Sequence, residues 1–188
     1  MRVSVIGVLL CLAATAITAG ASAAHGQKPT PTRRGIWFSG GMGWGSLGCP
    51  DGCTGRTRGL GGGFAVGGSL GPTLLVGGGT MAWTDSKNGA GIPVGLVDAR
   101  FRFYTSPTGG LHFTFGAGPG SVHTGVRGVG TGSITFGREW GVGLLLGAGF
   151  DVPVARRLSL TPFAHVYSVK TENLGANVAQ IGLSITVQ

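Results

Sequence analysis

Apolar residues alternate with small or polar residues along most of the chain, with a period of two. The longest apolar run, Trp140 to Phe150, has 11 residues; its even-numbered positions are all apolar and mostly large, whereas glycine fills four of its odd-numbered positions. Successive side chains of a β-strand point to opposite faces. The run therefore predicts a strand with one apolar face and one face of small residues, and its length matches the about 9–11 residues of a tilted strand that crosses a bilayer.

The same period recurs elsewhere. At the C-terminus, apolar residues at the odd positions of 179–187 alternate with polar or small residues. Within 97–104, apolar and aromatic residues alternate with Asp98, Arg100 and Arg102. Charged and apolar side chains are therefore expected on opposite faces of each strand.

One segment breaks the pattern. In 73–84 the apolar residues change phase between Val76 and Met81, which predicts a β-bulge around the glycines at 77–79. With this segment counted, eight strands are expected, at 35–44, 59–70, 73–84, 92–104, 111–118, 134–152, 158–169 and 177–188.

These strands are expected to close into a barrel. Beyond the first 24 residues, no stretch reaches the roughly 20 apolar residues that a membrane-spanning helix needs. Lipid cannot satisfy the open edge of a sheet, so spanning strands must close on themselves. The predicted fold class is all-β, an eight-stranded antiparallel up-and-down transmembrane β-barrel. A soluble β-sandwich is the alternative, but its outward faces should carry more lysine, glutamate and aspartate.

The connections between the predicted strands alternate in length. Short periplasmic turns and longer outer loops are typical of outer-membrane barrels. The short connections are 71–72, 105–110 and 153–157, and the longer or more polar ones are 45–58, 85–91, 119–133 and 170–176.

Composition supports a membrane setting. Charged residues make up 11% of the chain, compared with about 25% in an ordinary soluble domain, and this is too few to solvate a normal surface. Glycine accounts for 40 of the 188 residues. It lacks the Gly-X-Y period of collagen and sits among alternating apolar residues, which also argues against disorder.

The N-terminus has the pattern of an export signal. Arg2 precedes an apolar stretch that runs to Ala19, and small residues with an Ala-x-Ala pattern follow at 21–24, which favours cleavage over a retained membrane helix. The predicted organisation is a signal peptide at 1–24, a short tail at 25–34 and an outer-membrane barrel domain at 35–188.

Export would leave two cysteines, because Cys11 lies in the signal segment. Cys49 and Cys53 enclose a Pro-Asp-Gly turn sequence, and in an oxidising compartment a disulfide is expected in preference to a metal site. No histidine or cysteine pair stands nearby in sequence to complete a zinc tetrahedron. Neither a metal nor a cofactor is predicted.

The chain is basic. Loss of Arg2 with the signal lowers the formal net charge from +8 to +7. Nucleic acid is a poor candidate partner, because the basic residues are scattered and do not interleave with aromatic residues. Outer-membrane lipid with anionic headgroups is the partner expected, since a basic rim attracts such headgroups. A monomer is expected.

Five charged residues on the predicted inward faces form a candidate lumen network: Asp98, Arg100, Arg102, Glu139 and Asp151. An eight-stranded lumen is just wide enough for side chains to fill it, and buried charges need partners. We expect the arginines of the fourth strand to pair with the carboxylates of the sixth strand or with Asp98. The alternative is a substrate or ion path through gaps left by inward glycines.

Aromatic residues stand near the ends of several predicted strands. Amphipathic rings suit the headgroup zone of a membrane, so aromatic belts are expected there, with packing in a soluble core as the alternative. The residues are Trp37, Trp44, Trp83, Tyr104 and Trp140.

The pattern resembles a known family. The Gly-aromatic texture of 35–43, Gly-Ile-Trp-Phe-Ser-Gly-Gly-Met-Gly, and the eight-strand architecture of 35–188 are similar to the membrane domains of OmpA- and OmpX-like outer-membrane barrels. The resemblance implies a barrel in the outer membrane of a Gram-negative-type bacterium. One departure is the C-terminus: many family members end in an aromatic residue, whereas this chain ends in Gln188.

Some outer-membrane barrels are lipid-modifying enzymes, and lipid A deacylases carry a His-x-Ser pair on one strand. Here His165 and Ser168 have the spacing His-x-x-Ser, which places them on opposite faces of a strand. The histidine cannot then activate the serine, and no catalytic residue is predicted. We expect a non-enzymatic protein with a structural role or an unidentified surface ligand at its outer loops. The alternative is a narrow pore or a lipid-modifying enzyme.

Overall fold

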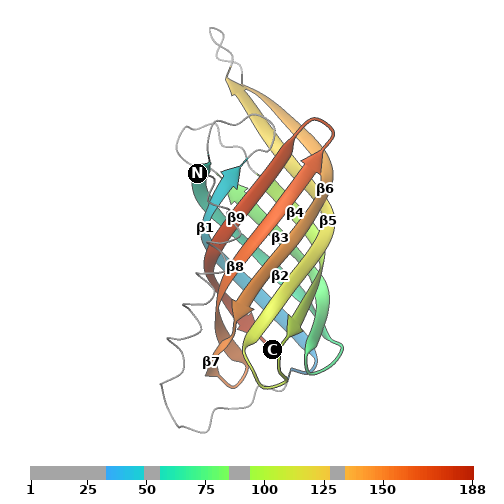
Figure 1. Cartoon of the computed structure of the whole chain (residues 1–188), viewed down its shortest axis with the longest axis vertical. Helices are drawn as coiled ribbons and strands as arrows, with labels where there is room; N and C mark the ends of the chain where they lie inside the picture. Colours follow the sequence, from blue (N-terminus) through green and yellow to red (C-terminus); the bar gives the residue numbers. More distant parts are fainter. Residues whose placement is uncertain (1–32, 49–55, 85–93, 128–133) are drawn as a thin grey trace, which may run out of the picture.

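The computed structural model describes residues 33–48, 56–84, 94–127 and 134–188, which form a closed antiparallel β-barrel (Figure 1). In Figure 1 the strand pairs β1–β2, β3–β4, β5–β6 and β8–β9 have their connected ends at the upper end of the barrel. The tight turns between the other strands lie at the lower end. The strands are β1 (Ile36–Gly48), β2 (Thr57–Ser69), β3 (Leu74–Thr84), β4 (Val94–Tyr104), β5 (Leu111–Arg127), β6 (Ile134–Phe150), β7 (Val152–Ala155), β8 (Leu158–Thr171) and β9 (Gly175–Val187).

The barrel closes between its first and last strands. β1 pairs with β9 from Phe38↔Val187 to Gly48↔Asn177. β8 pairs with both β9 and β6, so the sheet has no free edge along its eight long strands. The short β7 continues β6 against β8 in the same register as far as Pro153, and the register shifts before Ala155. The predicted eight-stranded up-and-down barrel is confirmed.

Alternation sets the two faces of the wall. Large apolar side chains point outward and are exposed on every long strand except β3, where Leu74 and Val76 are half-buried, whereas the intervening positions face the lumen. In β4, for example, Phe101 and Phe103 face outward, and Arg100, Arg102 and Tyr104 face inward. Among the residues that the structure describes, no helix is long and apolar enough to cross a membrane.

The prediction of a β-bulge in β3 is wrong. β3 pairs with β2 without a register shift from Leu75 to Thr84, and Leu75, Met81 and Trp83 all lie buried in the lumen. The outward positions carry Leu74 and Val76. The apparent phase change arises because the lumen beside Met81 and Trp83 is itself apolar, so hydrophobicity does not mark the outward face there.

Strand β5 runs past its predicted end at 118 as far as Arg127, so most of the loop expected at 119–133 is strand. The sequence concealed this because Pro119 has no N–H to donate. The ladder from β5 to β4 skips from Ala117 to Gly120, whereas the ladder to β6 pairs Pro119 with Val142 and continues without a break. The resulting β5–β6 hairpin projects beyond the other hairpins at the upper end of Figure 1.

The predicted sixth strand is interrupted at Asp151. β6 ends at Phe150 and β7 begins at Val152, and the Asp151 N–H donates to the Gly110 carbonyl of the neighbouring turn at 3.0 Å. The turn expected at 153–157 is shorter, because β7 extends to Ala155. Cys49, Cys53 and the signal segment 1–24 lie outside the described residues, as does most of the tail 25–34.

Candidate functional site

The lumen near the hairpin end is filled by an apolar cluster, which we call the apolar plug. Side chains from β1, β3, β4, β5, β6, β8 and β9 meet there. Trp83, Tyr167 and Val169 are among its most deeply buried members. The plug comprises Leu47, Met81, Trp83, Val94, Leu96, Val122, Leu145, Tyr167, Val169, Ala176 and Val178, with Leu174 packed against it.

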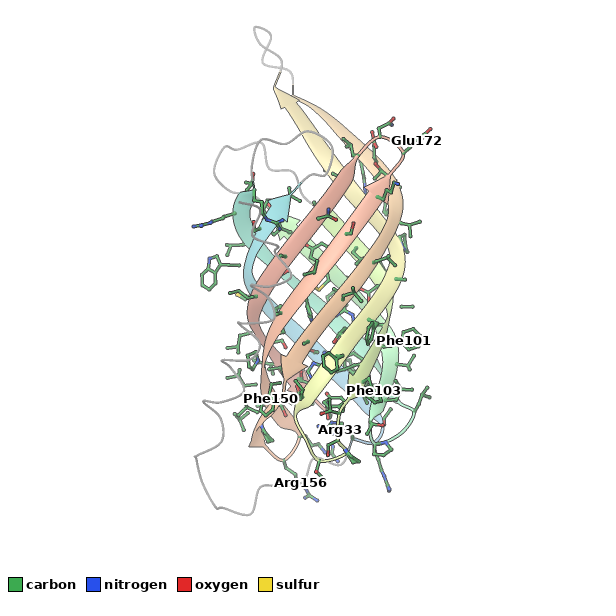
Figure 2. The ribbon with its side chains drawn as sticks, in the orientation of Figure 1. Arg33, Phe101, Phe103, Phe150, Arg156 and Glu172 are labelled. Atoms are coloured by element: carbon green, nitrogen blue, oxygen red, sulfur yellow. The ribbon has the colours of Figure 1, made fainter. Side chains whose placement is uncertain are left out.

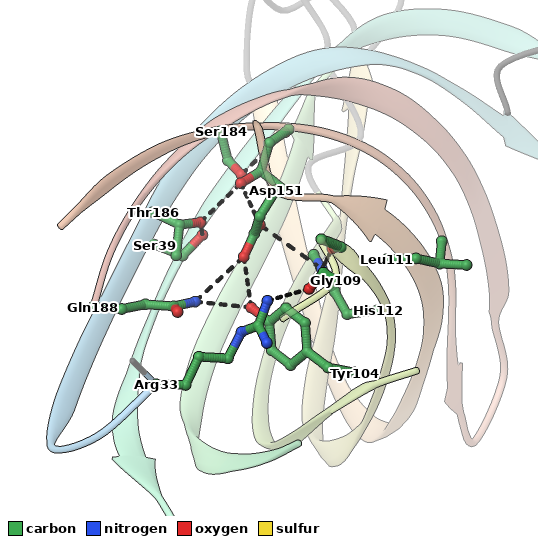
Figure 3. A network of polar contacts seen from close by, with 12 residues as sticks. Arg33, Ser39, Tyr104, Gly109, Leu111, His112, Asp151, Ser184, Thr186 and Gln188 are labelled. Carbon is green, nitrogen blue, oxygen red and sulfur yellow. Dashed lines mark hydrogen bonds and ion pairs between the residues drawn. The ribbon is translucent and has the colours of Figure 1, made fainter. Parts of the chain in front are cut away.

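The turn end holds a polar network centred on Asp151 (Figure 3). Its carboxylate accepts hydrogen bonds from the Tyr104 hydroxyl at 2.7 Å, from Thr161 at 2.7 Å and from the Gln188 amide at 3.3 Å. The Nδ1 atom of His112 lies 3.8 Å from the same carboxylate. The break between β6 and β7 thus places a buried acceptor where strands β4, β8 and the C-terminus converge.

Arg33 closes the mouth at this end. Its guanidinium lies 3.6 Å from the centroid of the Tyr104 ring and donates to three carbonyls of the β4–β5 turn, those of Ser106, Pro107 and Gly109. The side chain is 3% exposed. A cation on an aromatic face gains more when it is desolvated, so this contact fixes the start of the barrel to a turn more than 70 residues away.

Between the plug and the polar network lies a layer that contains two arginines. Arg100 donates to Asp98 through Nε at 2.8 Å and through Nη2 at 2.7 Å, a two-point ion pair within β4. Arg102 lies 4.8 Å from the Trp37 ring, and its Nε and Nη1 atoms have no hydrogen-bond partner among the described residues. A cavity of about 20 Å³ borders both guanidiniums.

The predicted lumen residues fall into two groups. Asp98, Arg100, Arg102 and Asp151 are buried in the lumen, but Arg100 pairs with its own strand and no ion pair joins β4 to β6 among the described residues. Glu139 lies at the hairpin end, where it accepts hydrogen bonds from Thr171 at 2.6 Å and Asn173 at 3.4 Å. The expected β4–β6 ion pairing is therefore replaced by separate sites, because the strand tilt puts Glu139 and Arg100 at different heights.

Of the five residues expected in aromatic belts, two lie on the outer wall. Trp44 and Trp140 are exposed on the outer wall, and Arg138 lies 3.8 Å over the Trp140 ring. Trp37, Trp83 and Tyr104 are instead buried in the lumen. The alternation along the strands already indicated an inward position for such a residue. Trp37, for example, stands between the outward Ile36 and Phe38.

Inward glycines make room for the large lumen side chains. A Cβ at Gly79 would lie 2.6 Å from the Arg100 guanidinium carbon, and one at Gly149 would lie 2.7 Å from His112 Nε2. At Gly45 the obstacle would be Trp83, at 2.7 Å. The high glycine content thus has a steric role, because each of these side chains lies close to the backbone of another strand.

Sequence reasoning missed Arg33, Tyr104, Thr161 and Gln188 as network members. Arg33 precedes the first strand, where no periodicity assigns a face. The hydroxyl and amide groups lie on inward positions but carry no charge to single them out. His165 is buried in the lumen, whereas Ser168 pairs with the outward Leu144, so the two side chains do not meet.

No protein-family model and no curated protein matches the chain. Solved structures share its fold. Neisserial surface protein A aligns with a TM-score of 0.59 at 13% identity, over 81% of this chain and 96% of that one. Ail, the attachment invasion locus protein of Yersinia pestis, aligns with a TM-score of 0.59 at 11% identity, over 81% and 99%. A structure of Ail with the heparin analogue sucrose octasulfate aligns with a TM-score of 0.55 at 13% identity, over 81% and 99%.

The chain resembles small outer-membrane barrels. At these identities the likeness shows the fold, and the function has to be argued from this chain's own surfaces.

Proposed function

We propose that this protein is a non-enzymatic integral barrel of a bacterial outer membrane, with a structural or surface-interaction role at its hairpin end. The observation that carries the proposal is the apolar outer wall. Exposed large apolar side chains cover the barrel on seven of its eight long strands, and on β3 the outward Leu74 and Val76 are half-buried. Soluble monomers rarely expose a contiguous apolar patch larger than a few hundred Å², whereas a lipid-facing wall requires one.

The wall is bounded by basic residues at both ends. Arg34, Arg156 and Arg157 are exposed at the turn end, and Arg138 and Lys170 are exposed on the outer face towards the hairpin end. Figure 2 shows Phe101, Phe103 and Phe150 on the wall, Arg156 below them and Glu172 at the opposite end. Basic side chains at these heights suit anionic lipid headgroups, and the outward Trp44 and Trp140 suit the interface.

The lumen argues against the pore alternative. The apolar plug and the Arg33 contact occupy its two ends, and the cavity between them is about 20 Å³. A closed barrel also leaves no strand edge that needs a second copy, which supports a monomer. The projecting β5–β6 hairpin and the likeness to Ail, an attachment protein, support a role in surface contact.

The membrane placement can be tested with a matched pair of variants. Leu144 faces outward at the middle of the apolar run on β6, and Thr84 faces outward at the last residue of β3. Arginine at the bilayer midplane of a barrel costs about 2–4 kcal/mol and near the interface about 0–1 kcal/mol. Leu144→Arg should therefore lower the yield of folded protein in lipid vesicles, scored by migration before and after boiling, whereas Thr84→Arg should not.

Equal yields for both variants, or recovery of the exported chain in the soluble fraction, would contradict the proposal. Planar-bilayer conductance tests the pore alternative separately, and the sealed lumen predicts no steady current. Release of acyl chains from lipid A by the purified barrel would contradict the non-enzymatic role.

A further inference from the structure

The cavity between the plug and the polar network has a lining suited to negative charge. It is bordered by the guanidinium groups of Arg100 and Arg102, by His112 and His165, and by serine and threonine hydroxyls. No aspartate or glutamate is among the described residues that line it. This lining contains positive groups and hydrogen-bond donors without a carboxylate to attract a cation.

Some of the polar groups that face this region have no partner elsewhere in the part of the chain that the structure describes. Arg102 Nε and Nη1 and His165 Nδ1 are buried and have no partner among the described residues. Ser39 accepts a hydrogen bond from Thr186 at 3.2 Å, which leaves its own hydroxyl hydrogen free. Arg102 is 4% exposed, so bulk water does not satisfy its guanidinium.

The buried charges do not balance. Among the described residues, Arg33, Arg100 and Arg102 are the buried cationic side chains, and Asp98 and Asp151 are the buried carboxylates. Asp98 is already paired with Arg100. The Asp151 carboxylate accepts hydrogen bonds from Tyr104, Thr161 and Gln188. Arginine remains protonated in proteins. Arg102 is therefore a buried cation without a carboxylate of its own, a costly arrangement unless an anion compensates it.

We propose that this cavity binds one small monovalent anion of the halide class, held by Arg102 together with His165 and Ser39. The volume of about 20 Å³ is of the size that holds a single water-sized species, which favours a monatomic anion over sulfate, phosphate or a carboxylate ligand. Arg33 and the apolar plug obstruct the two ends of the lumen, so the anion is taken up as the barrel folds and exchanges slowly afterwards.

Bromide is the probe, because it replaces chloride and scatters X-rays anomalously. The full exported chain is unfolded in urea and refolded into detergent in sodium bromide, or in sodium gluconate at equal ionic strength. Crystals of the bromide form should show one anomalous peak beside Arg102. Binding to the folded state alone lowers the unfolding equilibrium constant by a factor of 1 + [L]/Kd, so each tenfold rise in bromide above Kd should lower it about tenfold.

Arg102→Gln should remove the bromide dependence of unfolding, and Arg156→Gln, at the exposed rim, should retain it. A wild-type barrel with no anomalous peak in the cavity and equal unfolding in bromide and gluconate would overturn the proposal and leave water as the occupant. If Arg102→Gln does not refold, the wild-type anomalous map alone decides. A bromide effect that survives in Arg102→Gln would also count against the proposal.

Discussion

The two halves of the lumen are built from the same strands but held together by different forces. At the hairpin end, Leu145, Tyr167 and Val169 pack in an apolar plug. At the turn end, Tyr104 and Asp151 belong to a connected polar network. Apolar packing is non-directional and tolerates substitutions that conserve volume, whereas a buried polar network stabilises only if each member is satisfied. The halves should therefore respond differently to matched changes.

The largest effect is expected from Asp151→Ala. This change removes the acceptor of Tyr104 and Thr161 and one of two buried carboxylates among the described residues. Each buried hydroxyl left without an acceptor costs about 1–3 kcal/mol, so losing both should lower the free energy of unfolding, measured in urea and lipid vesicles, by about 2–6 kcal/mol. Asp151→Asn keeps an acceptor oxygen and should lose less. Equal losses for the two variants would show that the hydrogen bonds contribute little.

Leu145→Ala tests the apolar half of the lumen by leaving a cavity in the plug. Leu145 is 1% exposed within the plug, and a large-to-small change in a packed core costs about 2–5 kcal/mol. Leu144→Ala removes the same atoms from the outer side of the same strand and leaves no internal cavity, so its cost in the same unfolding assay should be smaller. A larger cost for Leu144→Ala would reverse the assignment of the two faces.

A single hydroxyl offers the sharpest comparison. Tyr104 donates to Asp151 and accepts from Gln188, whereas the Tyr167 hydroxyl in the plug has no partner among the described residues. Leaving a buried group unsatisfied costs about 1–3 kcal/mol, so Tyr104→Phe should destabilise the barrel by that amount. Tyr167→Phe should be neutral or stabilising. Similar unfolding midpoints for the two variants would mean that the two halves do not differ in polar satisfaction.

The smallest effects concern coupling between charges. Arg100 and Asp98 form a buried ion pair, so a double-mutant cycle on alanine variants should show coupling of about 0.5–3 kcal/mol. Arg100 and Glu139 share no partner, because Glu139 is bound by Thr171 and Asn173. Their effects should add. Coupling between Arg100 and Glu139 would restore the β4–β6 pairing that the structure replaces.

The period of two predicted the barrel because the outer face of the wall is apolar along the strands regardless of what the lumen contains. It failed where the lumen is also apolar, as at Met81 and Trp83 in β3. The partner of Arg100 was within reach of sequence reasoning, since Asp98 lies two residues away on the same face. Arg33 and Gln188 were not, because their contacts depend on barrel closure and on the heights of turns, which spacing along the chain does not encode.

The glycines beneath the lumen side chains have a consequence for evolution. Gly79 lies beneath Arg100, Gly149 beneath His112 and Gly45 beneath Trp83. In homologous barrels each such pair should covary: a chain that gains a side chain at the glycine should carry a smaller or differently oriented residue at its partner. Such compensated exchanges between strands would trace the lumen architecture through sequences too divergent to align by their apolar walls.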